Sequence, residues 1–300
     1  MDQDLRVGPR TPPSRAASFF FVGWAYVVAI GMGIAVGRLP DDVHPLWVAG
    51  AAMGVGALSL FVFSRAANNT SVFDAYWSVA PPAVTLYFLA IAEPGVPGAR
   101  QGLVVALVFT WALRLTANWA RSWPGLEHED WRYTEMRTNG HPYWVQSLFG
   151  LHLFPAVQVW LGCLALYPAL AVGTDGIGVL DAAAVLVTAG AITLEAVADE
   201  QLRAFNRTKG SGDICDIGLW GWSRHPNYLG EQLFWWGLWL FGLAADSGWW
   251  WTVIGPLAMS VMFATASIPM LERRSAERRP GWAEYCRRTS VLVPRPPRCP

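Results

Sequence analysis

The sequence predicts an all-α fold: a polytopic transmembrane helix bundle of about eight spans, with cytoplasmic N- and C-termini. Composition is the first observation, because 53% of the 300 residues are hydrophobic and only 15% are charged, against roughly 25% charged in soluble proteins. The mean hydropathy is +0.29. The second observation is a series of long apolar stretches, and the third is a one-sided distribution of basic residues. Together they exclude a soluble globular enzyme, a disordered chain and a nucleic-acid-binding protein.

Eight stretches approach the roughly 20 apolar residues that a spanning helix needs. They lie at about 17–37, 45–64, 72–92, 101–119, 148–172, 178–199, 227–245 and 249–269. Short polar or Pro/Gly-rich breaks separate them, such as Glu93-Pro94-Gly95 and Asp246-Ser247-Gly248. No small-residue cleavage site follows the first stretch, so we expect it to stay in the membrane as an anchor rather than act as a signal peptide.

The distribution of Lys and Arg predicts the orientation, because cytoplasmic loops carry an excess of basic residues. With the N-terminus inside, 20 of the 22 basic residues fall on the cytoplasmic side, and only Arg38 and Arg100 fall outside. Two large cytoplasmic loops are then expected at about 120–147 and 200–226. An integral, multi-pass location follows, which we expect to be the inner (cytoplasmic) membrane of a bacterium.

Five ionisable residues lie inside the predicted spans, where charges are costly and usually functional. They are Asp74, Arg114, Glu195, Asp199 and Glu231. All five fall in the cytoplasmic half of the bilayer by the predicted topology. One interpretation is a set of structural ion pairs, for example between Asp74 and Arg114. The other is a polar cavity, open to the cytoplasm, that binds a charged ligand.

The segment from Gly218 to Glu231 carries the most information. Pro226 suits the first turn of a helix, and the residue before a proline is held extended. The seventh span therefore begins at Pro226, and its free N–H groups, beside Arg224 and His225, attract anions. Asn227 lies one turn before Glu231, so both can hydrogen-bond a polar ligand. The alternative is a basic helix cap at the membrane surface.

The run Ser-Arg-His-Pro-Asn-Tyr-Leu-Gly-Glu at 223–231 resembles the C-terminal domain of the steroid 5α-reductase family, in a bacterial branch of membrane proteins. Sterol C14 and Δ7 reductases are more distant relatives. Further matches are Asp74-x-x-Trp77, Trp111-x-x-Arg114-Leu115, Glu129-Asp130-x-Arg132-Tyr133, Ala198-Asp199-x-Gln201 and Glu272-Arg273-Arg274. The resemblance covers about 70–294. Residues 1–69 form membrane spans without a named match, and 295–300 are expected to be a disordered tail.

The resemblance implies an NADPH-dependent reductase of a lipid-like unsaturated carbonyl or alkene, with the cofactor bound from the cytoplasmic side. Its partners would be a small lipophilic substrate and membrane lipids, with no nucleic acid; the oligomeric state is left open. Carried over to matching positions, the cofactor-binding residues are Arg114, Asp199, Arg207, Arg224, His225, Asn227, Tyr228, Glu231, Glu272 and Arg273. No glycine-rich dinucleotide fingerprint follows a strand, so the pocket is expected to be helical. The histidines lack metal-ligand spacing, and no metal is expected.

Reduction by hydride also needs a group that polarises the carbonyl and a proton donor. The candidate catalytic residues are Asp74 and Tyr76, both on the third span. In steroid reductases a Glu and a Tyr hold the ketone; the Glu position aligns with Asp74. The Tyr position falls on Trp111, which can donate a hydrogen bond but is no acid. This difference argues against a steroid substrate more than against cofactor binding.

A second class of enzyme fits the same residues. Arg-His-Pro-x-Tyr-x-Gly with a downstream Glu-Arg is shared with isoprenylcysteine carboxyl methyltransferase, where it holds S-adenosylmethionine. The longer run at 218–231 and the upstream matches favour the reductase. A non-catalytic membrane scaffold is a third interpretation, against which the buried charges argue.

Overall fold

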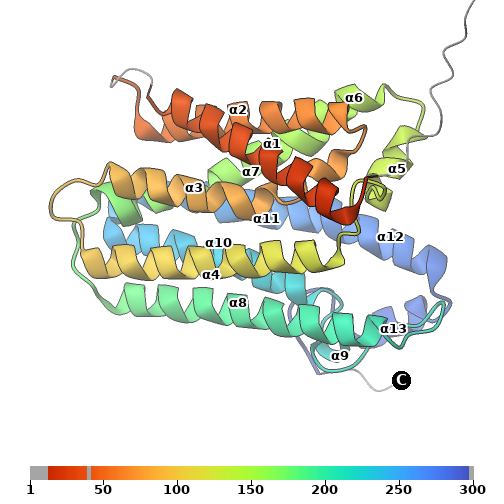
Figure 1. Ribbon diagram of the computed structural model, residues 1–300. Coiled ribbons are helices and arrows are strands. Elements are labelled where there is room, and N and C mark those ends of the chain that lie inside the picture. The colour runs from red at the N-terminus through yellow and green to blue at the C-terminus, as the bar shows by residue number, and fades with distance from the viewer. Residues whose placement is uncertain (1–12, 39–41, 297–300) are drawn as a thin grey trace, which may run out of the picture. The chain divides into compact units, whose positions relative to one another are not determined.

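A computed structural model describes residues 13–38 and 42–296 (Figure 1). All the regular elements in these residues are helices, and the extended pairing among them is one isolated bridge between Ser223 and Ser290. The predicted all-α fold is confirmed. The predicted disordered tail 295–300 lies outside the described residues beyond Pro296.

The helices follow the chain in two groups. Before residue 173 they are α1 (Arg15–Val36), α2 (Pro45–Ala66), η1 (Thr70–Phe73), α3 (Tyr76–Ala90), α4 (Gly98–Ser122), α5 (Trp131–Arg137), α6 (Tyr143–Gln146), η2 (Ser147–Leu153), α7 (Phe154–Cys163) and η3 (Pro168–Val172). After it they are α8 (Val179–Asn206), α9 (Leu219–Trp222), α10 (Pro226–Ala245), η4 (Ser247–Val253), α11 (Ile254–Met262), η5 (Phe263–Ser267), α12 (Ile268–Arg278) and α13 (Trp282–Arg288).

Within the described residues, six helices or continuous helical runs are long and apolar enough to cross a membrane. They are Arg15–Val36, Pro45–Ala66, Gly98–Ser122, Tyr143–Val172, Val179–Asn206 and Ser247–Arg278. The other two predicted spans are also helical, as α3 with 15 residues and α10 with 20. The protein is therefore a polytopic helical membrane protein. The count of eight spans and the cytoplasmic termini stay predictions.

The chain divides into two compact units. Unit 1 contains the described residues up to Ala80 together with Leu115–Val157, and unit 2 contains Pro81–Arg114 and the described residues from Gln158 onward. The chain passes from one unit to the other within α3, α4 and α7.

In unit 1, the loop before α5 is fixed by side chains from the segment after α2. The Asn69 amide donates to the carbonyls of Leu126 (2.8 Å) and His128 (3.0 Å). Glu129 accepts from the Thr70 backbone N–H (2.8 Å) and forms a two-bond ion pair with Arg137 at 2.6 and 3.0 Å. The predicted loop at 120–147 is thus ordered by polar contacts.

In unit 2, α8 and α10 pack side by side (Figure 1), and glycines of α10 permit the close approach. A Cβ added at Gly230 would lie 2.7 Å from Cβ of Glu195, and one added at Gly237 would lie 2.1 Å from Oγ1 of Thr188. Both distances are far below ordinary van der Waals contact, so the spacing of these helices requires glycine at both positions.

The sequence placed Arg100 in an outer loop, and the structure places it elsewhere. It lies in α4 with a fully buried side chain, paired with Asp181 at 2.7 and 3.1 Å. Its guanidinium also donates to the carbonyls of Asp175, Gly176 and Ala244. A buried charge is tolerated when it is paired and hydrogen-bonded, and this geometry meets both conditions. Hydropathy alone could not reveal it, because the partners are distant in sequence.

Candidate functional site

The candidate site lies in unit 2, where α4 up to Arg114, the last turns of α8 and the first turns of α10 meet. Pro226 begins α10, as predicted, and His225 precedes it with φ of −139° and ψ of 58°, which is neither helical nor the extended conformation expected before a proline. Each helix contributes ionisable or amide side chains at this end. The predicted in-membrane charges of these three helices therefore come together, rather than facing lipid separately.

Arg114 is the centre of the first cluster. Its Nη2 atom lies 2.5 Å from Oε2 of Glu195, and its Nη1 donates to Oδ2 of Asp199 at 3.0 Å. Glu195 is buried, and the side chain of Asp199 is 13% exposed. The amide of Asn227 donates to the other oxygen of Asp199 at 3.4 Å. One arginine thus holds two carboxylates on one face of α8, and the second carboxylate reaches α10.

Glu231 is held by two tryptophans. Trp111 Nε1 donates to one carboxylate oxygen and Trp235 Nε1 to the other, both at 3.0 Å. Both indoles are completely buried, and Trp111 stacks on Phe234 with ring centroids 4.1 Å apart. Each carboxylate oxygen has two acceptor positions, so Glu231, which is half-buried, keeps acceptor capacity for a ligand while its orientation is fixed.

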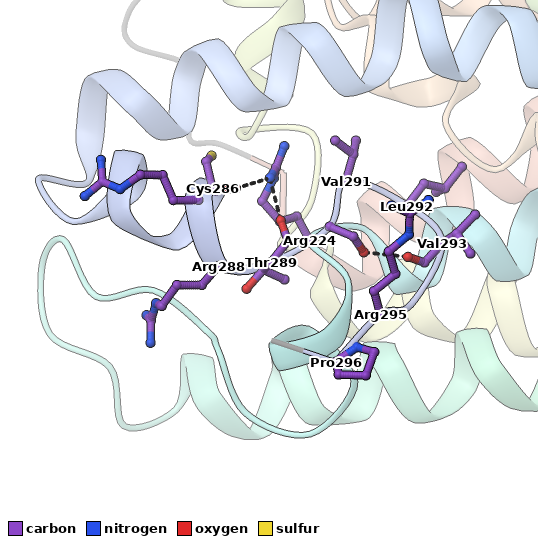
Figure 2. Close-up of a pocket in the computed structure, with 11 residues that line it drawn as sticks. Arg224, Cys286, Arg288, Thr289, Val291, Leu292, Val293, Arg295 and Pro296 are labelled. Atoms are coloured by element: carbon purple, nitrogen blue, oxygen red, sulfur yellow. Dashed lines mark hydrogen bonds between the residues drawn. The ribbon is translucent and has the colours of Figure 1, made fainter. Parts of the chain in front are cut away.

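A second cluster forms around Glu272 of α12. Its Oε1 atom accepts from Arg224 Nε at 2.8 Å and lies 2.7 Å from His225 Nε2. Arg224 also donates through Nη1 to the carbonyls of Thr289 (2.7 Å) and Cys286 (3.1 Å), as Figure 2 shows. The arginine of the motif is therefore largely engaged by the protein itself.

The C-terminal segment is bound along the motif by further contacts. Arg224 N–H donates to the Ser290 carbonyl (2.9 Å), and the Ser223 hydroxyl donates to the Leu292 carbonyl (2.7 Å). The Tyr285 hydroxyl donates to the Trp220 carbonyl at 2.6 Å. Burial raises the pKa of Tyr285 above its usual range, so this donor stays protonated. The segment after α13 is thus part of the wall around Arg224.

The remaining predicted cofactor residues occupy different environments. Tyr228 stacks on His225 with ring centroids 5.6 Å apart and packs on Phe263 at 4.7 Å. Arg207 caps the end of α8 and is exposed, and Arg273 on α12 is also exposed. The Arg114 cluster thus brings together Asp199 and Asn227, and the Glu272 cluster brings together Arg224 and His225.

The two candidate catalytic residues belong to unit 1 and have separate partners. Asp74 accepts from the Tyr133 hydroxyl at 2.6 Å. Burial, together with the Asp74 charge, raises the pKa of Tyr133 well above its usual range. Tyr76 is 4% exposed, and its hydroxyl donates to the Met53 carbonyl at 3.0 Å. Its proton is committed to the backbone, and the hydroxyl that contacts Asp74 is that of Tyr133.

The sequence did not assign site roles to four residues whose side chains contact predicted site residues in the structure. They are Trp111, Tyr133, Glu195 and Trp235. Glu195 carried a signal, because it was a charge inside a predicted span, one turn before Asp199 on the same face. Trp111 also carried a signal, because its position matches the Tyr that holds the ketone in steroid reductases, and Trp235 lies one turn after Glu231 on α10.

These features define a helical membrane protein with a buried, charged polar site between helices. The chain matches the family described as "Protein of unknown function (DUF1295)" over residues 60–289. It belongs to this family, which comprises steroid 5α-reductase-like proteins. The resemblance predicted from the sequence is confirmed at this level.

A relative is an uncharacterized protein of Schizosaccharomyces pombe, 29% identical over 255 residues that cover 76% of this chain and 73% of the relative. No solved structure matches the chain.

Proposed function

We propose that this protein is an NADPH-dependent reductase of a lipid-like unsaturated carbonyl or alkene, with the cofactor bound from the cytoplasmic side of a bacterial inner membrane. We assign it to a bacterial branch of the steroid 5α-reductase-like family. The observation that carries the proposal is the convergence of Arg114, Glu195, Asp199, Asn227 and Glu231 from three helices of an otherwise apolar unit. Polar groups buried among apolar helices mark ligand sites in membrane proteins.

The residues present fit a nicotinamide dinucleotide. Its carboxamide and ribose hydroxyls need donors and acceptors at fixed positions, which Asn227 and Glu231 supply from consecutive turns of α10. Asn227 is half-buried and is held by one bond of 3.4 Å to Asp199, so its amide can exchange that partner for a ligand. Glu231 keeps free acceptor positions beside the indole N–H groups.

The phosphates of such a cofactor need cationic groups nearby, and arginine forks match phosphate oxygens bidentately. Arg207 at the end of α8 and Arg273 on α12 are exposed and could each engage a phosphate. Arg224 instead holds Glu272 and the C-terminal segment. Its first role is therefore to position His225 and that segment.

The chemistry of the bound cofactor is hydride donation, and the chain must supply a proton to the other carbon or to the oxygen. Asp74 and Tyr76 stay the candidates of unit 1 for this chemistry, and the Tyr133 hydroxyl donates to Asp74 at 2.6 Å. Through this hydrogen bond Tyr133 orients the Asp74 carboxylate. Trp111 only orients Glu231, because its N–H is committed there.

The test is thermal stabilisation of the purified full-length protein in detergent by four ligands: NADPH, NADH, S-adenosylmethionine and S-adenosylhomocysteine. The proposal expects NADPH to stabilise most, with NADH weaker. Asn227→Ala should reduce the stabilisation, whereas Asn206→Ala, at an exposed amide on the end of α8, should not. Stabilisation by the two adenosyl compounds and not by NADPH would reject the reductase and support a methyltransferase.

A further inference from the structure

A separate feature of unit 2 is a cavity of about 390 Å³ between the motif and the C-terminal segment (Figure 2). Its size lies within the range of small-molecule pockets, roughly 300–1,000 Å³. Apart from Arg224, its lining comes from residues 286–296. The cavity is therefore formed by the end of α13 and the chain that follows it.

The charge of the lining has one sign. Four of the lining residues are Arg224, Arg287, Arg288 and Arg295. None of the acidic side chains in the described residues lines the cavity. Thr289 and Ser290 add hydroxyl and backbone groups. A cleft lined by a single sign of charge concentrates counter-ions, and this sign selects anions.

Three carboxylates behind the lining compensate part of this charge. Arg224 pairs with Glu272 at 2.8 Å, and Arg287 pairs with Glu284. Arg288 lies 3.5 Å from a carboxylate oxygen of Asp216, and Glu284 is also near it at 3.8 Å.

Arg295 has no carboxylate partner within the described part of the chain, so one arginine charge of the lining is uncompensated. The position of Arg295 is itself fixed, because its N–H donates to the Trp222 carbonyl at 3.1 Å.

Arg224 contributes a hydrogen-bond donor of fixed orientation to this cavity. Its side chain is 9% exposed, and Nε and Nη1 are engaged by Glu272 and two backbone carbonyls. Its Nη2 group has no hydrogen-bond partner within the described residues. A buried guanidinium that the protein holds through Nε and Nη1 thus keeps Nη2 as a donor to an anion in the cavity that it lines.

We propose that this cavity binds a phosphate group. A phosphate carries up to two charges and several strong acceptor oxygens, so it can engage more than one arginine, which a single carboxylate does less well. The phosphate could belong to a nucleotide, to a phospholipid headgroup or to free phosphate. The inference does not require the reductase function, since it depends only on the arginine lining and its geometry.

The test measures dissociation constants by calorimetry on the full-length protein in a neutral detergent. The probes are inorganic pyrophosphate, adenosine 2′,5′-bisphosphate and dihexanoyl phosphatidic acid. At least one probe should bind, and binding should weaken with salt. Arg295→Ala and Arg288→Ala should each raise the dissociation constant by about tenfold or more, as loss of a charge-assisted bond does. Arg295→Lys should recover part of the affinity.

The control is Arg278→Ala, which removes an exposed arginine at the end of α12 outside the lining and should leave affinity unchanged. Binding of the adenosine compound alone identifies a nucleotide, of phosphatidic acid alone a lipid, and of pyrophosphate alone free phosphate; each outcome supports the site. The inference is rejected if no probe binds, or if the arginine variants bind like the control. If NADPH stabilises Arg295→Ala as well as wild type, the reductase proposal survives without this cavity.

Discussion

Removal of the Arg114 side chain tests the central cluster most directly. In Arg114→Ala, the buried carboxylates of Glu195 and Asp199, which now lie 2.5 and 3.0 Å from the guanidinium, lose their cation. Breaking a buried pair by deleting one partner costs about 3–5 kcal/mol. We expect a loss of that order in the free energy of unfolding, because two carboxylates are left where one arginine had compensated both.

The assay is reversible unfolding in mixed micelles by added SDS, followed by tryptophan fluorescence. Arg121→Ala is the matched control, two turns further along α4 with an exposed side chain, and should change stability by less than about 0.5 kcal/mol. Glu195→Gln in the Arg114→Ala background should recover part of the loss, since one unpaired charge is removed. A double-mutant cycle should give a coupling above about 0.5 kcal/mol. If Arg114→Ala unfolds like Arg121→Ala, the cluster is not the buried ion network described above.

Three further predictions concern packing, the Glu231 cradle and topology. Gly237→Ala should lower stability strongly, because its Cβ would meet Thr188, whereas Gly190→Ala in α8, with open space around it, should be neutral or stabilising by up to about 1 kcal/mol; the same SDS titration compares them. Trp111→Phe keeps a ring but removes one N–H bond to Glu231, so stability should fall by about 1.5–3 kcal/mol and NADPH affinity should fall with it. A reporter that is active only in the cytoplasm should give signal when it is fused to the C-terminus. Activity of a reporter that works only after export would refute the predicted orientation.

Much of the fold was predictable because the length and apolar composition of a segment identify a bilayer-spanning helix. Helices occupy all eight predicted stretches, and α10 begins at Pro226, where the missing N–H of proline costs no helical hydrogen bond. The third stretch is shorter than expected. Its first residues form the separate turn η1, and α3 runs for only 15 residues with Pro81 and Pro82 inside it.

The site was less predictable, because its contacts join residues far apart in sequence. Spacing put Glu195 and Asp199 on one face of α8, but nothing local could show that Arg114 holds both. Asp74 and Tyr76 were paired by proximity in sequence, yet Asp74 meets Tyr133 while Tyr76 donates to a backbone carbonyl of α2. Side-chain direction depends on the packing partner, which periodicity does not identify.

The ties between Arg224 and the segment after α12 bear on biosynthesis. Arg224 is translated well before its partners, which lie 48, 62 and 65 residues later in the chain. Until those residues leave the ribosome, the guanidinium has neither its carboxylate nor its carbonyls, and His225 lacks its anchor. The motif therefore matures only after residues 286–289 have left the ribosome. Nascent chains stalled before residue 290, or mutants with a premature stop there, should expose this region to proteases and membrane quality control even when every spanning helix is already in place.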